Sequence, residues 1–290
     1  MKPFSLFINT NSPTNTISPT KRKRTPDDYT PQKKEANYLE KIKSAGLREY
    51  FTQASHDLKQ SNTPENNDLV YTVMKTATRI VFHRDRQFET CSSPAVYYDS
   101  SVYTDSENHI VKVIEYNNNY ECADFDLVKE VATQKYVYKI IAPECGFKTP
   151  RILSFGKVSP FIPPVQRRNY NCAFFIVMEK VDDPQLKDYL ATASESDRLR
   201  VNAQLAEIKK CLSHNHIYHN DIHVENVMVG ADITIIDWGR GGTDFDYTRW
   251  KDATKRGGRR RRMTRKNRKQ GTLVGGRRKT SNSPNRKSRR

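Results

Sequence analysis

The sequence has no long apolar run and no closely spaced cysteines. Its longest strongly apolar run, from Ala173 to Met178, is far too short to cross a bilayer, and the N-terminus has no apolar core like that of a signal peptide. The cysteines are odd in number and form no C-x-x-C pair, which argues against a closed set of disulfides. They are Cys91, Cys122, Cys145, Cys172 and Cys211. We therefore expect a soluble protein of a reducing intracellular compartment, nuclear or cytoplasmic, with no membrane partner.

Acidic residues are absent from residues 255–290, where 17 side chains are Lys or Arg. The formal net charge of the whole chain, +17, therefore belongs to this tail. Because so dense a charge cannot bury apolar surface, we expect a disordered basic tail that binds nucleic acid or an acidic partner. A nuclear localisation signal, or a packing aid in a particle that contains nucleic acid, would also explain it. Residues 1–36, rich in Ser, Thr, Pro and Asn, are predicted to be a second disordered arm with a basic cluster at 21–24.

The most informative residues are Asp221 and Asn226, in the segment HNDIHVEN, and Asp237, which begins the run Asp-Trp-Gly eleven residues after Asn226. Phosphoryl transfer from Mg-ATP to a hydroxyl needs one carboxylate to orient the hydroxyl. It also needs an amide oxygen and a second carboxylate to hold magnesium. Two short apolar runs, 227–229 and 233–236, lie between the motifs. They predict a hairpin that sets both metal-binding groups at adjacent strand ends.

This pattern, H-x-D-x-x-x-x-N followed by D-[FW]-G, resembles the catalytic and metal loops of the protein kinase superfamily. The resemblance covers residues 66–254 and implies an α+β, two-lobed protein-kinase-like fold that uses ATP and Mg²⁺. It implies an N-lobe over 66–180 and a truncated C-lobe over 181–254, after an N-terminal helical extension over 37–65. The chain is also similar to the minimal atypical kinases of the Rio and KEOPS-associated kind. In its basic tail it resembles compact kinase-like proteins of large DNA viruses.

Lys112 is the single charge in the apolar run 110–114, which predicts a strand, and a buried charge of this kind needs a partner. A helix is predicted over 122–141, with Glu130 within its apolar stripe. In the kinase family such a Lys binds the ATP phosphates and pairs with a Glu on the following helix. The resemblance therefore implies an ion pair between Lys112 and Glu130. A solvent-facing Lys on an edge strand and an ordinary surface Glu are the alternative.

Periodicity predicts further elements. A helical pattern covers 37–60, with a bend at Gly46, and the chain becomes β-rich from about residue 67. A long amphipathic helix is predicted over 196–217. Its apolar stripe consists of Leu199, Leu205, Ile208 and Leu212. Separate short strands are predicted at 97–98, 102–103 and 152–156.

Residues 174–181 resemble the last N-lobe strand and the hinge of kinases. In that family Met178 would lie behind the adenine of ATP. The backbone C=O of Glu179 and the N–H of Val181 would bind the adenine edge. These three contacts are implied by the resemblance alone, because a buried strand explains the same apolar run.

The loop expected to cover the phosphates departs from the kinase pattern. No glycine lies between Gly46 and Gly146, so this loop, near 91–96, lacks the usual glycines and must hold ATP differently. Asn220 replaces the Arg that reads a phosphorylated activation loop, so we expect no switching of that kind. His223 stands two residues after the catalytic Asp, where Ser/Thr kinases usually carry Lys, and we expect it to contact the γ-phosphate.

The lower lobe is short, because only 51 residues follow Gly239 and 36 of them are the basic tail. No A-P-E segment is present. We expect Asp244 or Asp246 to brace the catalytic loop, and a protein partner to complete the lower lobe.

The leading hypothesis is an atypical serine/threonine protein kinase that transfers the γ-phosphate of ATP to a protein hydroxyl. Asp221 would be the catalytic base, and Asn226 and Asp237 would hold Mg²⁺. Lys112, braced by Glu130, would neutralise the α- and β-phosphates. The basic tail would bring the enzyme to nucleic acid or to acidic partners.

Three alternatives remain open. A pseudokinase scaffold, tethered to nucleic acid by its tail, would explain the missing glycines. A small-molecule phosphotransferase of the aminoglycoside- or choline-kinase kind would explain His223. A zinc site would use four histidines, although their spacing suits no single helical face and His219 fits better as a structural part of the catalytic loop. The four are His214, His216, His219 and His223.

Overall fold

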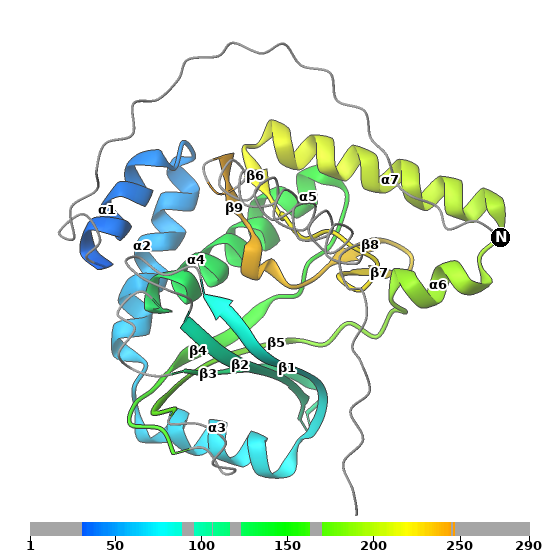
Figure 1. Cartoon of the computed structure of the whole chain (residues 1–290). Coiled ribbons are helices and arrows are strands. Elements are labelled where there is room, and N and C mark those ends of the chain that lie inside the picture. The colour runs from blue at the N-terminus through cyan, green and yellow to red at the C-terminus, as the bar shows by residue number, and fades with distance from the viewer. Residues whose placement is uncertain are drawn as a thin grey trace, which may run out of the picture.

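The computed structural model describes residues 31–88, 96–105, 107–116, 123–162, 170–244 and 246. Within these residues the protein is a mixed α+β structure, as predicted, built around one five-stranded antiparallel sheet (Figure 1). The chain before residue 31, the predicted phosphate loop apart from its last residue, and the basic tail lie outside the described residues.

Among the residues that the structure describes, three helices precede the sheet, and the other helices alternate with groups of strands. The helices are α1 (Pro31–Lys41), α2 (Ala45–Gln60), α3 (Pro64–Thr76), α4 (Ala123–Tyr136), α5 (Ala142–Cys145), α6 (Leu186–Thr192) and α7 (Glu195–His214), with a π-helical turn η2 (Val137–Ile141) and a 3-10 turn η3 (Trp238–Arg240). The strands are β1 (Thr78–Phe88), β2 (Val96–Thr104), β3 (His109–Tyr116), β4 (Ile152–Val158), β5 (Cys172–Glu179), β6 (Ile217–Tyr218), β7 (Val227–Val229), β8 (Ile233–Ile235) and β9 (Gly242–Thr243).

The five-stranded sheet has the strand order β1-β2-β3-β5-β4, so β3, which carries Lys112, is its central strand. Lys112 lies opposite Val102 of β2 and Ile176 of β5. The alternative of an edge-strand lysine is therefore wrong. The predicted separate strands at 97–98 and 102–103 are also wrong, because pairing with β1 and β3 carries β2 continuously through the polar residues between them.

Residues 64–76 form helix α3, where the sequence predicted strands from about residue 67. Thr63 caps this helix by accepting a hydrogen bond from a backbone N–H of the first turn, and Pro64 occupies its first position. Val70 and Val73 lie one turn apart and are buried against the sheet. Tertiary packing of this apolar face therefore outweighs the preference of valine for strands.

Two hydrophobic cores lie on opposite faces of the sheet. Figure 1 shows α3 below the sheet and α4 above it. On one face, α3 covers strand residues that include Val111 and Phe175. On the other face, Ile114 and Phe174 join α2, α4, α7 and the β7–β8 hairpin in one larger core. Side chains alternate along a strand, so Lys112 projects into the side of the sheet that α4 covers.

Helices α1 and α2 pack beside α4 (Figure 1). The predicted helical pattern over 37–60 is confirmed, but the break between the two helices lies at 42–44 and not at Gly46. Gly46 belongs to the first turn of α2. A Cβ there would come within 3.0 Å of the Tyr136 ring of α4, so the glycine permits close approach of the two helices.

An aromatic cluster joins these three helices. The rings of Tyr38, Phe51 and Phe125 contact one another, with centroids 5.2 to 5.6 Å apart. Such ring pairs stabilise packing beyond the apolar area they bury. This anchoring through Tyr38 accounts for a helix that begins at Pro31, inside the arm predicted to be disordered over 1–36.

Helix α7 and the β7–β8 hairpin belong to the part of the fold built from residues 181–244, which Figure 1 shows above the sheet. The predicted strand at 152–156, the hairpin and the long helix are confirmed as β4, β7–β8 and α7. Leu199 is 61% exposed, so its place in the predicted stripe is wrong. The buried stripe begins instead at Val201, because steps of four, three and four residues then reach the three other predicted positions.

Of the helices that the structure describes, none is long and apolar enough to span a membrane.

A disulfide joins Cys145, at the end of α5, to Cys211 of α7. The expectation that the cysteines are unpaired is wrong for these two residues, and the cysteine argument for a reducing compartment fails with it. The partners are 66 residues apart in sequence, and the packing of α5 on α7 brings them together. Cys172 is a free, buried cysteine.

Candidate active site

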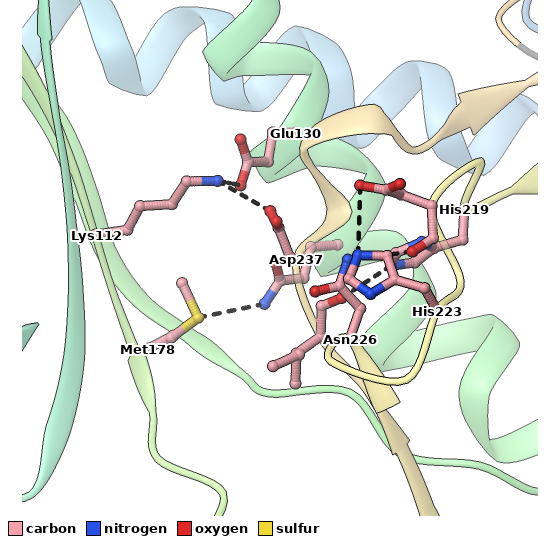
Figure 2. Close-up of polar contacts among 10 residues, drawn as sticks. Lys112, Glu130, Met178, His219, His223, Asn226 and Asp237 are labelled. Atoms are coloured by element: carbon pink, nitrogen blue, oxygen red, sulfur yellow. Dashed lines mark hydrogen bonds and ion pairs between the residues drawn. The ribbon is translucent and has the colours of Figure 1, made fainter. Parts of the chain in front are cut away.

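Lys112 connects the sheet to two other parts of the chain. Its Nζ lies 2.6 Å from Oε1 of Glu130 on α4, so the predicted ion pair is present. It also lies 3.1 Å from Oδ1 of Asp237, which directly precedes η3. Figure 2 shows Lys112 reaching from its strand to both carboxylates. Gly239 permits the close approach of its backbone to Glu130, since a Cβ at this position would lie 3.2 Å from Oε2 of Glu130.

The electrostatics of this cluster favour a bound cation. Burial alone would lower the pKa of Lys112, but the carboxylates of Asp237 and Glu130 outweigh it, so the pKa is raised and the amine stays charged. Burial raises the pKa of Glu130, and Lys112 opposes that shift. When both carboxylates are ionised, the cluster carries one net negative charge. The side chain of Asp237 is 36% exposed, against 7% for Glu130, so Asp237 is the carboxylate that a cation can reach.

His219 anchors the predicted catalytic loop, residues 219–226, to the residues on either side of Asp237. Its Nε2 lies 2.9 Å from the C=O of Ile236, and its ring meets the Trp238 ring edge-on with centroids 4.6 Å apart. Burial lowers the pKa of His219, so we assign a neutral ring with Nε2–H as the donor. Its role as a structural histidine of this loop therefore agrees with its contacts.

Asn226 ends the predicted catalytic loop and contacts the residue that precedes the predicted metal loop, 237–239. Its Nδ2 donates to the backbone C=O of Asp221 at 3.1 Å, and its own backbone C=O accepts from the N–H of Ile236 at 3.0 Å. Because the amide nitrogen is engaged, the amide oxygen is the atom left for a cation. An amide oxygen from Asn226 and a carboxylate from Asp237 fit Mg²⁺, which usually keeps waters and substrate phosphates as its other ligands.

Two basic side chains approach the carboxylate of Asp221. Arg240 Nη1 donates to Oδ1 at 2.9 Å, and His223 Nε2 lies 3.9 Å from Oδ2. Asn220, with a φ of 63°, turns the chain just before Asp221, and its Nδ2 donates to the backbone C=O of Arg240 at 2.9 Å. Sequence reasoning treated Asn220 only as a replacement for Arg and did not find Arg240. The available signal was a basic residue next to Asp-Trp-Gly.

The predicted adenine contacts lie at the end of β5. Met178 faces α4, where Gln134 Nε2 lies 4.0 Å from its Sδ (Figure 2). The carboxylate of Glu179 pairs with Arg151 at 3.1 Å, so its side chain is already engaged. Val181 follows the strand in a segment without regular structure. The adenine-binding roles of all three residues stay predictions.

Asp246 braces the segment that follows the metal loop. Its carboxylate accepts hydrogen bonds from Tyr38 Oη and from the backbone N–H of Thr243, each at 2.9 Å, and pairs with Lys129 at 3.2 Å. Burial, and then the charge of Asp246, raise the pKa of Tyr38 well above its ordinary value, so the phenol keeps its proton. Asp246 therefore ties α1 and α4 to residues just beyond the metal loop.

Asp244 makes a second connection between the N-terminal helices and the part built from residues 181–244. It pairs with Lys43 at 3.0 Å and with His216 at 2.9 Å. The sequence predicted that Asp244 or Asp246 would brace the catalytic loop. Their side chains instead contact the N-terminal helical segment, α4 and His216, which precedes that loop. Within the described ranges, no group of three or more His, Cys, Asp or Glu side chains is placed to hold a metal ion.

The candidate active site gathers side chains from β3, α4, the catalytic loop and the metal loop, which together span residues 112–240. No protein-family model matches this sequence, and no curated protein matches it significantly. The functional argument therefore depends on the geometry and charge of these side chains.

Proposed function

We propose that this protein is an ATP-dependent phosphotransferase with a two-lobed protein-kinase-like fold. The observation that carries the proposal is the contact of the largely enclosed Lys112, whose side chain is 15% exposed, with both Glu130 and Asp237. Phosphoryl transfer needs a phosphate-binding cation, a carboxylate to hold that cation and a metal-binding carboxylate at one place. The five-stranded antiparallel sheet within residues 78–179, followed by a smaller part within 181–244, supports the proposal of an N-lobe over 66–180 and a C-lobe over 181–254.

In the proposed reaction, the acceptor oxygen bonds to the γ-phosphorus while the bond from that phosphorus to the β–γ bridging oxygen breaks and ADP leaves. The proton of the acceptor hydroxyl passes to the carboxylate of Asp221. Lys112 binds the α- and β-phosphates, with Glu130 holding its amine in position. Magnesium, held by Asn226 and Asp237, would neutralise charge on the phosphates.

We propose a serine or threonine of a protein as the acceptor. The loop that carries Asp221 lies at the surface: Val224 is 39% exposed and the side chain of His223 is 43% exposed. A surface loop suits a hydroxyl presented on a protein better than a small molecule that must be enclosed. The basic tail would increase the local concentration of acidic or nucleic-acid partners. A partner that completes the lower lobe stays a prediction.

Transfer of radiolabelled γ-phosphate from Mg-ATP tests the proposal. The whole chain is incubated alone and with histone, casein and myelin basic protein, beside the variants Asp221→Asn and Lys112→Ala. The matched control is Asp188→Asn, which alters an exposed aspartate on α6. We expect label with the native chain and the control, and transfer about 10²- to 10⁴-fold slower with Asp221→Asn, as loss of a general base predicts.

The other two functions give different results in the same assay. A chain that binds no ATP and labels no protein would contradict the proposal and favour the scaffold. Label that passes to choline or an aminoglycoside, but to no protein, would favour the small-molecule phosphotransferase. Equal label with the native chain and Asp221→Asn would exclude Asp221 as the base.

A further inference from the structure

Arg240 is held against the catalytic loop by two separate contacts. Its guanidinium donates to the carboxylate of Asp221 at 2.9 Å, and its backbone C=O accepts from the side chain of Asn220 at 2.9 Å. Its own turn is closed by the N–H of Gly241, which donates to the C=O of buried Trp238 at 2.7 Å. Asn220 thus holds the backbone of Arg240, and Asp221 holds its guanidinium.

His223, the second basic side chain near Asp221, lies beyond hydrogen-bond distance of that carboxylate. Its Nε2 lies 3.9 Å from Oδ2 of Asp221, and its Nδ1 accepts a hydrogen bond from the backbone N–H of Glu225 at 3.2 Å. Arg240 carries a permanent positive charge. Among the described residues, it is the permanently charged cation in contact with the Asp221 carboxylate.

Phosphoryl transfer needs positive charge on the oxygens of the transferred group as well as on the other phosphates. Lys112 pairs with Glu130 and Asp237 and is assigned above to the α- and β-phosphates. His223 stands two residues after Asp221, where Ser/Thr kinases usually carry Lys. The side chain of Arg240 is 58% exposed, and of its five N–H donors one is bonded to Asp221. The remaining donors form the planar fork that suits phosphate oxygens.

We propose that Arg240 binds the terminal phosphate of a nucleoside triphosphate and, through its contact with Asp221, orients the catalytic carboxylate. This inference depends on the proposed phosphotransferase function and adds to it a specific γ-phosphate ligand. The phosphate charge is neutralised by a residue of the metal loop instead of the catalytic loop. Asn220 then has a stated role: its amide fixes the backbone from which Arg240 reaches the phosphate.

The test compares the affinities of the whole chain for Mg-ATP and Mg-ADP by isothermal titration calorimetry. The variants are Arg240→Ala and Arg240→Lys. The matched control is Arg200→Ala, which removes a half-exposed arginine that pairs with Asp197 on α7. We expect Arg240→Ala to bind Mg-ATP about ten- to a hundredfold more weakly, as loss of a hydrogen bond between charged groups predicts, and to bind Mg-ADP unchanged. Arg240→Lys should keep part of the preference for ATP, and Arg200→Ala all of it.

Three outcomes would overturn the inference. Equal affinity of native chain and Arg240→Ala for Mg-ATP would show that Arg240 does not bind the terminal phosphate, while leaving the proposed function intact. Faster phosphate transfer by Arg240→Ala would show that the contact of Arg240 with Asp221 inhibits the catalytic carboxylate instead of orienting it. A native chain that is folded by circular dichroism and binds neither nucleotide would refute the proposed function itself.

Discussion

Replacing Lys112 by methionine tests the charged cluster at the centre of the site. Methionine keeps much of the apolar stem but removes the charge, so the carboxylates of Glu130 and Asp237 lose their shared partner. Removal of one partner of a buried ion pair costs about 3–5 kcal/mol. Asp237 is 36% exposed and Glu130 only 7%, so water relieves the first but not the second. We expect the free energy of unfolding at pH 7 to fall by about 3 kcal/mol, near the lower limit of that range.

Urea denaturation followed by tryptophan fluorescence measures this loss. The double variant Lys112→Met/Glu130→Gln should be about 2 kcal/mol more stable than Lys112→Met, because it no longer buries an unpaired charge. The control is Lys157→Met, since Lys157 pairs with Asp124 at 2.9 Å in a more exposed position and should lose about 1 kcal/mol or less. The single variant Glu130→Gln completes the comparison. If the losses in free energy of unfolding of the two single variants add up to the loss of the double variant, the reasoning is refuted.

The pH dependence of the same variant checks the cause. Without Lys112, the folded-state pKa of Glu130 rises further above its ordinary value of 4.5. An acid with a raised pKa destabilises the folded state only above its unfolded pKa. The deficit of Lys112→Met should therefore be small at pH 4 and grow toward pH 7. In the native chain the raised pKa of Lys112 stabilises the fold fully below 10.5, and this stabilisation is lost as the pH rises through the folded-state value.

Further predictions concern contacts outside the charged cluster. Tyr38→Phe removes one hydrogen bond to Asp246 and should lower the free energy of unfolding by about 1.5 kcal/mol in urea; an unchanged midpoint would show that this bond is not formed in solution. Cys145→Ser opens a loop of 66 residues and should cost about 4 kcal/mol in the chain-entropy model, a loss that dithiothreitol should reproduce with the native chain but not with the variant. Gly242→Ala places a Cβ against the carboxylate of Asp246 and should lower the melting temperature, with a loss of about 1–3 kcal/mol. Native-like melting of Gly242→Ala would contradict the close approach of this backbone to Asp246.

Much of the site could be predicted because its signals are local. An isolated Lys112 in an apolar strand and Glu130 within an apolar stripe each predicted a buried partner, and the structure pairs them. The hairpin between Asn226 and Asp237 followed from two short β-prone runs. The errors also had local causes: valines in α3 suggested strands, and Leu199 was taken for the start of a stripe that begins at Val201.

Contacts between residues distant in sequence could not be predicted, because no periodicity or spacing records them. Tyr38 and Asp246 are 208 residues apart, and Cys145 and Cys211 are 66 apart. Arg240 lies 19 residues after Asp221, in a different loop. Each contact exists because helices and loops that fold from local signals then pack in one arrangement.

The sequence by itself determined the polar groups of the site and the order of the elements that carry them, since spacing and apolar periodicity act over short distances along the chain. Tertiary structure alone decided which charges meet. It put Asp237 beside Lys112 through the packing of α4 on the metal loop, and it put Arg240 on Asp221 through the turn at Asn220. The physical reason is that buried charges need partners, and only the folded chain brings those partners within hydrogen-bonding distance.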